Sequence, residues 1–148
     1  MHQTERRKGG CLCSAVRYEV SLPERHYNIC HCERCRKWSG GPFMAVHCLG
    51  DVVYGEDRGL KWYKGTPWAE RGFCGDCGTS LFWRLADDPD ALLIVTIDSL
   101  DQSEDIILER HIFIDAKPER YDFKGDHPRV TEAQVMAEVA AATGGVQE

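Results

Sequence analysis

The sequence lacks a hydrophobic run long enough to cross a membrane or to serve as a secretion signal. It begins with the polar stretch MHQTERRK at residues 1–8, whereas a signal peptide carries an apolar core of about 7–15 residues. We therefore expect a cytoplasmic protein with no membrane partner. Disulfides are rare in that compartment, so the cysteines need another explanation.

The sequence also lacks concentrated positive charge and the common motifs for nucleotide or hydrolase chemistry. It has 18 Lys and Arg against 24 Asp and Glu, a formal net charge of −6, and no basic cluster able to follow a phosphate backbone. No phosphate loop, dinucleotide fingerprint or Ser-His-Asp order occurs. These absences exclude a general nucleic-acid partner and several large enzyme classes.

Short strand-like segments dominate what is present. They occur at residues 11–20, 43–48, 60–64, 80–85, 91–97 and 106–114, separated by turns that carry Gly, Pro or Asp. In the first, Val16, Tyr18 and Val20 alternate with less apolar neighbours. Only the C-terminal end has a helical pattern, because residues 131–134 (TEAQ) form a capping box before an alanine-rich stretch. The pattern predicts a mainly β, single antiparallel domain with a short C-terminal helix.

Seven of the eight cysteines fall into three short clusters. The clusters are Cys11-Leu12-Cys13, Cys30-His31-Cys32-Glu33-Arg34-Cys35 and Cys74-Gly75-Asp76-Cys77. Both the C-x-x-C turn and the C-x-C strand segment bring two sulfurs to the same side of the backbone, where they can share one ion. The spacing therefore indicates metal binding, with zinc as the expected ion.

Counting ligands suggests how the clusters divide. Zinc prefers four ligands, and a catalytic site keeps one position for water or substrate. Two pairs, Cys11/Cys13 with Cys74/Cys77, make a closed four-sulfur site. The middle cluster offers three sulfurs, Cys30, Cys32 and Cys35, which favours a second, reactive zinc. Two structural zinc knuckles, redox chemistry and iron–sulfur ligation stay open as alternatives, and Cys48 is expected to be a buried apolar thiol.

With these residues in view, the chain resembles the glutathione-dependent formaldehyde-activating enzyme family, which also includes the centromere protein V domain. The resemblance covers residues 9–129. Its motifs are Gly-Gly-Cys-Leu-Cys at 9–13, Cys-His-Cys at 30–32, Cys35-Arg36-Lys37, Arg71-Gly72-Phe73-Cys74, Cys77-Gly78-Thr79 and the segment from His111 through Ala116-Lys117-Pro118. The chain departs from the commoner family pattern at Ser14, where glycine is frequent, and at Glu119-Arg120, where an aromatic residue is frequent.

The resemblance implies a β-tent-like zinc domain over residues 9–129, with a polar N-terminal tail at 1–8 and a C-terminal helix and tail at 130–148. It implies a structural zinc on Cys11, Cys13, Cys74 and Cys77 and a labile zinc on Cys30, Cys32 and Cys35, two per chain. The implied activity is that of a carbon–sulfur lyase, an S-(hydroxymethyl)glutathione synthase that uses a small thiol such as glutathione and an aldehyde such as formaldehyde. A non-catalytic zinc-binding structural or interaction module is the alternative.

Residues around the middle cluster are the further candidates. Arg34, Arg36 and Lys37 are candidate anchors for the carboxylates of a glutathione-like substrate, although exposed charges of this kind are usually only solvated. His31 lies between two ligands on an extended backbone, so its ring is expected to point away from the metal. It is expected to be a structural histidine, with a supporting contact to the metal ligands or a role as proton carrier as the alternatives, and a structural role is expected for His111.

Overall fold

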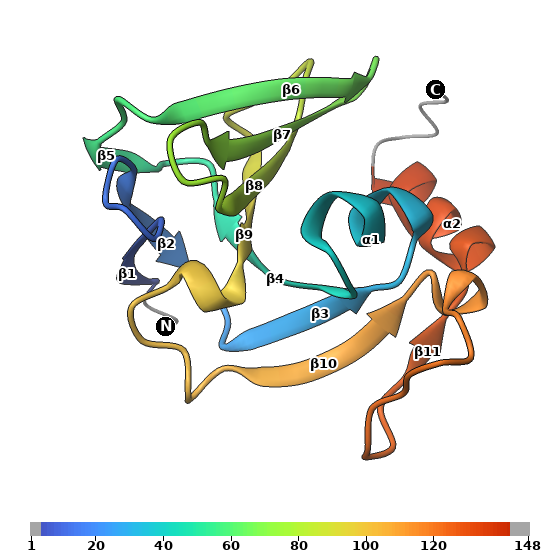
Figure 1. Ribbon diagram of the computed structural model, residues 1–148. Helices are drawn as coiled ribbons and strands as arrows, with labels where there is room; N and C mark the ends of the chain where they lie inside the picture. The colour runs from blue at the N-terminus through green and yellow to red at the C-terminus, as the bar shows by residue number, and fades with distance from the viewer. Residues whose placement is uncertain (1–3, 143–148) are drawn as a thin grey trace. The chain divides into compact units, whose positions relative to one another are not determined.

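The computed structural model describes residues 4–142, and strands dominate it, with 44% strand and 17% helix. The mainly β prediction is confirmed. The contacts divide the chain into two compact units. One comprises the chain up to Tyr27 together with Ala45–Ile107, and the other comprises Asn28–Met44 together with the chain from Leu108 onward. Figure 1 labels their elements.

The first unit contains a three-stranded antiparallel sheet with the order β1-β2-β5. Its strands are β1 (Glu5–Gly10), β2 (Arg17–Leu22) and β5 (Val53–Glu56). Tyr18 and Val20 of β2 are buried, as the alternating pattern predicts. The predicted strand over residues 11–20 is wrong in its first part, because residues 11–16 form a turn and the strand begins at Arg17. Residues 5–8, which the sequence assigns to a polar tail, form most of β1.

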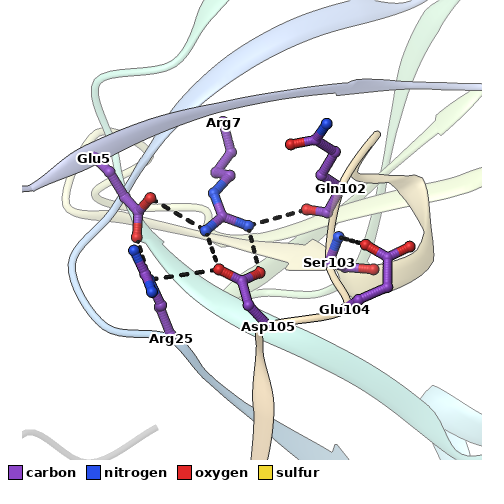
Figure 2. Close-up of polar contacts among 7 residues, drawn as sticks. All are labelled: Glu5, Arg7, Arg25, Gln102, Ser103, Glu104 and Asp105. Carbon is purple, nitrogen blue, oxygen red and sulfur yellow. Dashed lines mark hydrogen bonds and ion pairs between the residues drawn. The ribbon is translucent and has the colours of Figure 1, made fainter.

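Ion pairs hold this polar strand in place (Figure 2). Arg7 donates to both carboxylate oxygens of Asp105 at 2.9 and 2.7 Å and to Glu5 at 3.1 Å, while Arg25 donates to Glu5 at 2.8 Å. The hydrogen bonds from Arg7 lower the pKa of Asp105 to about 2. A charged sequence thus becomes a strand because each of these charges has a partner.

The first unit also contains an antiparallel run of strands with the order β4-β9-β8-β7-β6. Their bounds are β4 (Phe43–Leu49), β6 (Leu60–Thr66), β7 (Ala69–Cys74), β8 (Ser80–Leu85) and β9 (Leu92–Thr96), and the 3-10 helix η1 (Ile97–Ser99) follows β9. Phe82 is fully buried and contacts Tyr18 edge-on at 5.0 Å between ring centroids. Cys48 is 2% exposed, which confirms that it is a buried thiol.

The second unit is built around the end of β3, with strand order β11-β10-β3. Its elements are β3 (His26–Cys30), α1 (Glu33–Ser39), β10 (Ile107–Ile112), the 3-10 helix η2 (Ile114–Ala116), β11 (Arg129–Val130) and α2 (Glu132–Ala142). The capping box is confirmed, since Thr131 N donates to Gln134 Oε1 at 2.8 Å and Gln134 N donates to Thr131 Oγ1 at 3.2 Å. No helix of residues 4–142 is long and apolar enough to span a membrane.

Helix α1 corrects the sequence prediction, which places no helix before the C-terminal end. It has only seven residues, ERCRKWS, and no apolar face that a periodic pattern could reveal. Its ends are satisfied locally. The Cys32 sulfur accepts from Cys35 N at the start, and Gly40, at φ +87°, donates to Arg36 O at the end. The caps stabilise this helix, and one of them is a candidate metal ligand.

Candidate metal centres

Four cysteines of the first unit bring their sulfurs together, although they come from two distant segments. The Sγ atoms of Cys11, Cys13, Cys74 and Cys77 all lie within 4.8 Å of one another. Cys13 Sγ is 3.8 Å from both Cys11 Sγ and Cys74 Sγ. Tetrahedral zinc with Zn–S bonds of about 2.3 Å requires sulfurs about 3.8 Å apart. The group therefore fits a four-sulfur metal site.

The backbone around Cys74 explains how this geometry is held. Gly78 N donates to Cys74 O at 2.8 Å, and the turn is completed by Gly78 at φ +80°, which favours glycine. Gly59 passes so close that a Cβ there would lie 2.9 Å from Cys74 Sγ. The glycines thus permit a turn and a close approach that larger residues would disturb.

Thr79 supports the same group, a role that sequence reasoning did not assign. Its hydroxyl oxygen accepts from Leu12 N at 3.2 Å and lies 3.2 Å from Cys77 Sγ. A hydroxyl group can accept and donate at the same time, so the O–H of Thr79 can donate to the sulfur. That hydrogen bond is the main reason why the pKa of Cys77 is lowered to about 5. Thr79 therefore favours the thiolate form, which is the form that binds metal.

Three cysteines of the second unit form a separate group. Cys30 ends β3, Cys32 precedes α1, and Cys35 lies in its first turn. Their Sγ atoms lie within 4.8 Å of one another. The neighbouring Cys32 and Cys35 thiols, together with burial, raise the pKa of Cys30 above its ordinary range. A cation is needed to keep three thiolates this close, because like charges oppose one another's ionisation.

No fourth His, Cys, Asp or Glu from residues 4–142 joins the three sulfurs at this spacing. His31 is nearest in sequence, but its ring nitrogens are engaged elsewhere. Nδ1 lies 2.9 Å from Tyr121 Oη, and Nε2 lies 2.9 Å from His111 Nδ1. Burial, with the charge of His111 second, lowers the pKa of His31 to about 4. The ring of His31 is therefore committed to a neutral hydrogen-bonded cluster.

The three basic candidates differ in their surroundings. Arg34 and Lys37 are exposed. Arg36 is half-buried, and it donates from Nε to His31 O at 2.9 Å and from Nη2 to Ala116 O at 3.4 Å. Arg36 therefore braces the backbone beside the three sulfurs. Binding of a substrate carboxylate by any of the three stays a prediction.

Sequence reasoning gave no role to Tyr121, which contacts His31 through its hydroxyl group. It follows Lys117-Pro118 by a few residues, and no spacing rule connects it to the cysteines. The contact arises only because the chain after η2 returns to the end of β3, where the His31 and Tyr121 rings stack at 5.7 Å between centroids.

The model of a family described as glutathione-dependent formaldehyde-activating enzyme matches residues 6–116. The chain belongs to this family. Both cysteine groups and His111 lie inside the matched region, and Tyr121 lies beyond it.

The chain is also similar to individual proteins. An uncharacterized lyase of Schizosaccharomyces pombe is 32% identical over 132 residues, covering 89% of this chain and 96% of the relative. A putative glutathione-dependent formaldehyde-activating enzyme of Halomonas elongata is 35% identical over 85 residues, covering 51% of this chain and 54% of that protein. A crystal structure of a Rhodobacter sphaeroides protein has a TM-score of 0.55 at 26% identity, covering 68% of this chain and 98% of the other.

Proposed function

We propose that the protein is a zinc-dependent carbon–sulfur lyase that joins a small thiol such as glutathione to an aldehyde such as formaldehyde. One observation carries the proposal. The three sulfurs of Cys30, Cys32 and Cys35 share a site that no fourth ligand from residues 4–142 completes. A metal site closed by four protein ligands has no position for a substrate, whereas a site with three protein ligands leaves one coordination position open to it. Membership of the family and the names of the relatives support the choice of substrates.

The proposal includes two zinc ions per chain with different roles. The four-sulfur group would hold the structural ion, and Cys30, Cys32 and Cys35 would hold the reactive one. When bound there, zinc supplies a positive charge that lowers the pKa of thiols, so that a thiol substrate is present as thiolate near neutral pH. The same charge offsets the crowding of the three cysteine sulfurs.

The reaction requires no oxidant or reductant. The thiolate sulfur forms a bond to the aldehyde carbon, the carbonyl π bond breaks, and the oxygen takes up a proton to give the S-hydroxymethyl product. The reverse reaction breaks the carbon–sulfur bond, which is the lyase direction. The protein contributes orientation and charge, with the exposed side chains of Arg34 and Lys37 beside the cluster as candidate partners for the substrate carboxylates.

Cobalt substitution tests the proposal, because the absorption of cobalt(II) reports its ligands. We expect glutathione to change the spectrum of the wild-type protein and not that of Cys32→Ser, which should retain about one metal per chain instead of about two. Cys48→Ala is the matched control, since Cys48 lies outside both groups, and it should behave like the wild type. The rate of adduct formation from glutathione and isotope-labelled formaldehyde then measures catalysis.

Two results would count against the enzyme. If both metals stay bound and the absorption spectrum of the cobalt-substituted protein does not change when glutathione is added, the protein is a non-catalytic zinc module. If glutathione binds but adduct formation proceeds at the uncatalysed rate, the site binds thiols without the proposed activity.

A further inference from the structure

We propose that His111 and Tyr121 are positioning residues for the three-cysteine group, and that they act through His31. The inference deepens the proposed function and rests on its premise that Cys30, Cys32 and Cys35 bind a metal. It assigns a purpose to the two buried histidines, His31 and His111.

The polar groups of His31 are all engaged within the second unit. Its ring bonds to Tyr121 Oη and His111 Nδ1, each at 2.9 Å. Its main-chain N–H donates to Ile112 O at 3.1 Å, and its carbonyl accepts from Arg36 Nε at 2.9 Å. The side chain is 0% exposed. The position and orientation of this residue are therefore fixed from four directions.

Contacts that fix the position of His31 also fix the candidate ligands on either side of it. Cys30 and Cys32 are its two chain neighbours, so the direction in which their sulfurs point follows the backbone at His31. Cys32 is also the residue that starts α1, at φ −66° and ψ 154°, and the helix carries Cys35. A rotation at His31 would move all three sulfurs. Metal sites depend on such supporting contacts as well as on the ligands themselves.

Tyr121, His31 and His111 form a chain of hydrogen bonds. In the neutral form each imidazole has one donor and one acceptor, so the chain runs in a single direction. Either His31 donates to His111 and accepts from Tyr121, or it accepts from His111 and donates to Tyr121. A polar atom at the position of His111 Nδ1 completes the chain in both cases. An amide meets this need, because it offers both a donor and an acceptor.

A purely structural histidine is the competing explanation. His111 is 1% exposed, and its ring packs 5.6 Å from that of Phe123. If packing were its whole role, a hydrophobic side chain of similar size would serve the metal group equally well. The proposal instead requires a polar atom at this position, which gives a test that separates the two.

The test measures the affinity of the three-cysteine group for cobalt(II), by competition with a coloured chelator, in protein whose four-cysteine group keeps zinc. His111→Leu should weaken this affinity by about 10-fold or more, the usual effect of losing an outer partner of a metal site. His111→Asn should stay within about 3-fold of the wild type, because it restores the hydrogen bond. Zinc at the four-cysteine group should be unchanged in both.

Tyr121→Phe removes one hydroxyl group from a half-buried side chain and gives a second readout if His111→Leu does not fold. It should weaken cobalt binding about 3-fold to 10-fold, about 1 kcal/mol for one hydrogen bond. Tyr63→Phe, which removes the same atom from an exposed residue of β6, is the matched control and should have no effect.

Unchanged cobalt affinity in Tyr121→Phe overturns the inference, and so does equal loss in His111→Leu and His111→Asn. The proposed function fails in a different way. If the wild-type protein binds no second metal, the premise fails. If the wild-type protein binds the second metal and the variants bind it with the same affinity, only the positioning role is refuted.

Discussion

Cys13 Sγ and Cys74 Sγ lie 3.8 Å apart although 61 positions separate them in the chain. Closing a loop of this length costs about 3–4 kcal/mol of chain entropy, whereas binding of structural zinc contributes roughly 10–16 kcal/mol. A zinc ion bound by this group would therefore dominate this part of the energy balance, and it would tie β7 to the segment before β2 within the first unit.

We accordingly expect Cys74→Ser to release the zinc of the four-cysteine group and to unfold the first unit at ordinary temperature. Strong chelators should do the same to the wild-type protein. Circular dichroism with metal analysis on the same sample measures both effects. Cys48→Ala, a substitution at a buried cysteine outside the group, should lower stability by about 1–2 kcal/mol without loss of metal. A folded, zinc-free Cys74→Ser protein would contradict the prediction.

Substitution of Ser14 should stabilise the protein instead of destabilising it. Ser14 occupies the turn after Cys13 at φ +67°, a left-handed conformation that costs a non-glycine residue roughly 1–2 kcal/mol. Glycine would remove this cost but lose roughly 0.5–1 kcal/mol through greater freedom when unfolded. Ser14→Gly should therefore stabilise the protein by about 0.5–1 kcal/mol, measured by denaturant unfolding of the zinc-loaded form.

Ser14→Ala is the control for that experiment. It keeps the Cβ and therefore the backbone strain, so its stability should stay close to that of the wild type. If alanine stabilises the protein as much as glycine does, the effect comes from the side chain and not from the backbone.

The sequence predicted those features that depend on local pattern. The alternation of Tyr18 and Val20 and the capping box of Thr131 and Gln134 both act over a few residues, and both are found. Helix α1 was missed because its seven residues have no periodic apolar face, and its start is capped by a cysteine sulfur. Helix N-caps are usually Ser, Thr, Asp or Asn and not Cys, so the C-x-x-C motif indicates metal ligation and gives no sign of a helix start.

In the candidate site, too, the features set by local sequence were predictable and those that depend on the fold were not. The pairs Cys11/Cys13 and Cys74/Cys77 and the cluster of Cys30, Cys32 and Cys35 follow from spacing, because C-x-C and C-x-x-C bring sulfurs together locally. Ligand counting suggested that the two pairs share one group, but their meeting across 61 positions depends on the fold. The contacts of His31 with His111 and Tyr121 join positions 80 and 90 residues apart. Such pairs depend on how β3, β10 and the chain after η2 meet, and no local pattern encodes that meeting.

The ion pairs of Figure 2 give a prediction about stability. The side chain of Arg7 is 12% exposed and bonds to Asp105 and Glu5, whereas that of Arg25 is 60% exposed. Arg7→Met should lower the unfolding midpoint clearly more than Arg25→Met, because Arg7 is the less solvated of the two and also donates to both oxygens of Asp105 and to Gln102 O. Combining Arg7→Met with Asp105→Asn should cause less loss than the two single effects added together.

The pH dependence of this contribution follows from the lowered pKa of Asp105. Its folded pKa is about 2, below the ordinary value of 3.8, so the stabilisation is present above the unfolded pKa and is lost as the pH falls toward 2. The stability difference between wild type and Asp105→Asn should thus be constant from about pH 8 to about pH 5.5. A difference that declines across that range would show that another group controls the interaction.

The basic residues beside the three-cysteine group give the last prediction, because they should separate into two kinds. Arg36 donates to two main-chain carbonyl groups, those of His31 and Ala116, and lysine cannot reproduce this planar geometry. Arg36→Lys should therefore weaken cobalt binding at the group by several-fold, about 1 kcal/mol for a lost hydrogen bond. Lysine keeps the positive charge, so a loss of cobalt affinity would come from the lost hydrogen-bond geometry of the guanidinium group and not from a change of charge.

Lys37→Gln should affect glutathione binding and not metal binding. Lys37 is exposed, so cobalt affinity should be unchanged, while glutathione should bind about 2-fold to 5-fold more weakly, the range for one exposed charge pair. The difference should shrink as salt is added, because salt screens exposed charges. Titration of the cobalt-loaded protein with glutathione at low and high salt measures this. If neither Lys37→Gln nor Arg34→Gln alters glutathione binding, these side chains do not bind the substrate and its carboxylates bind elsewhere.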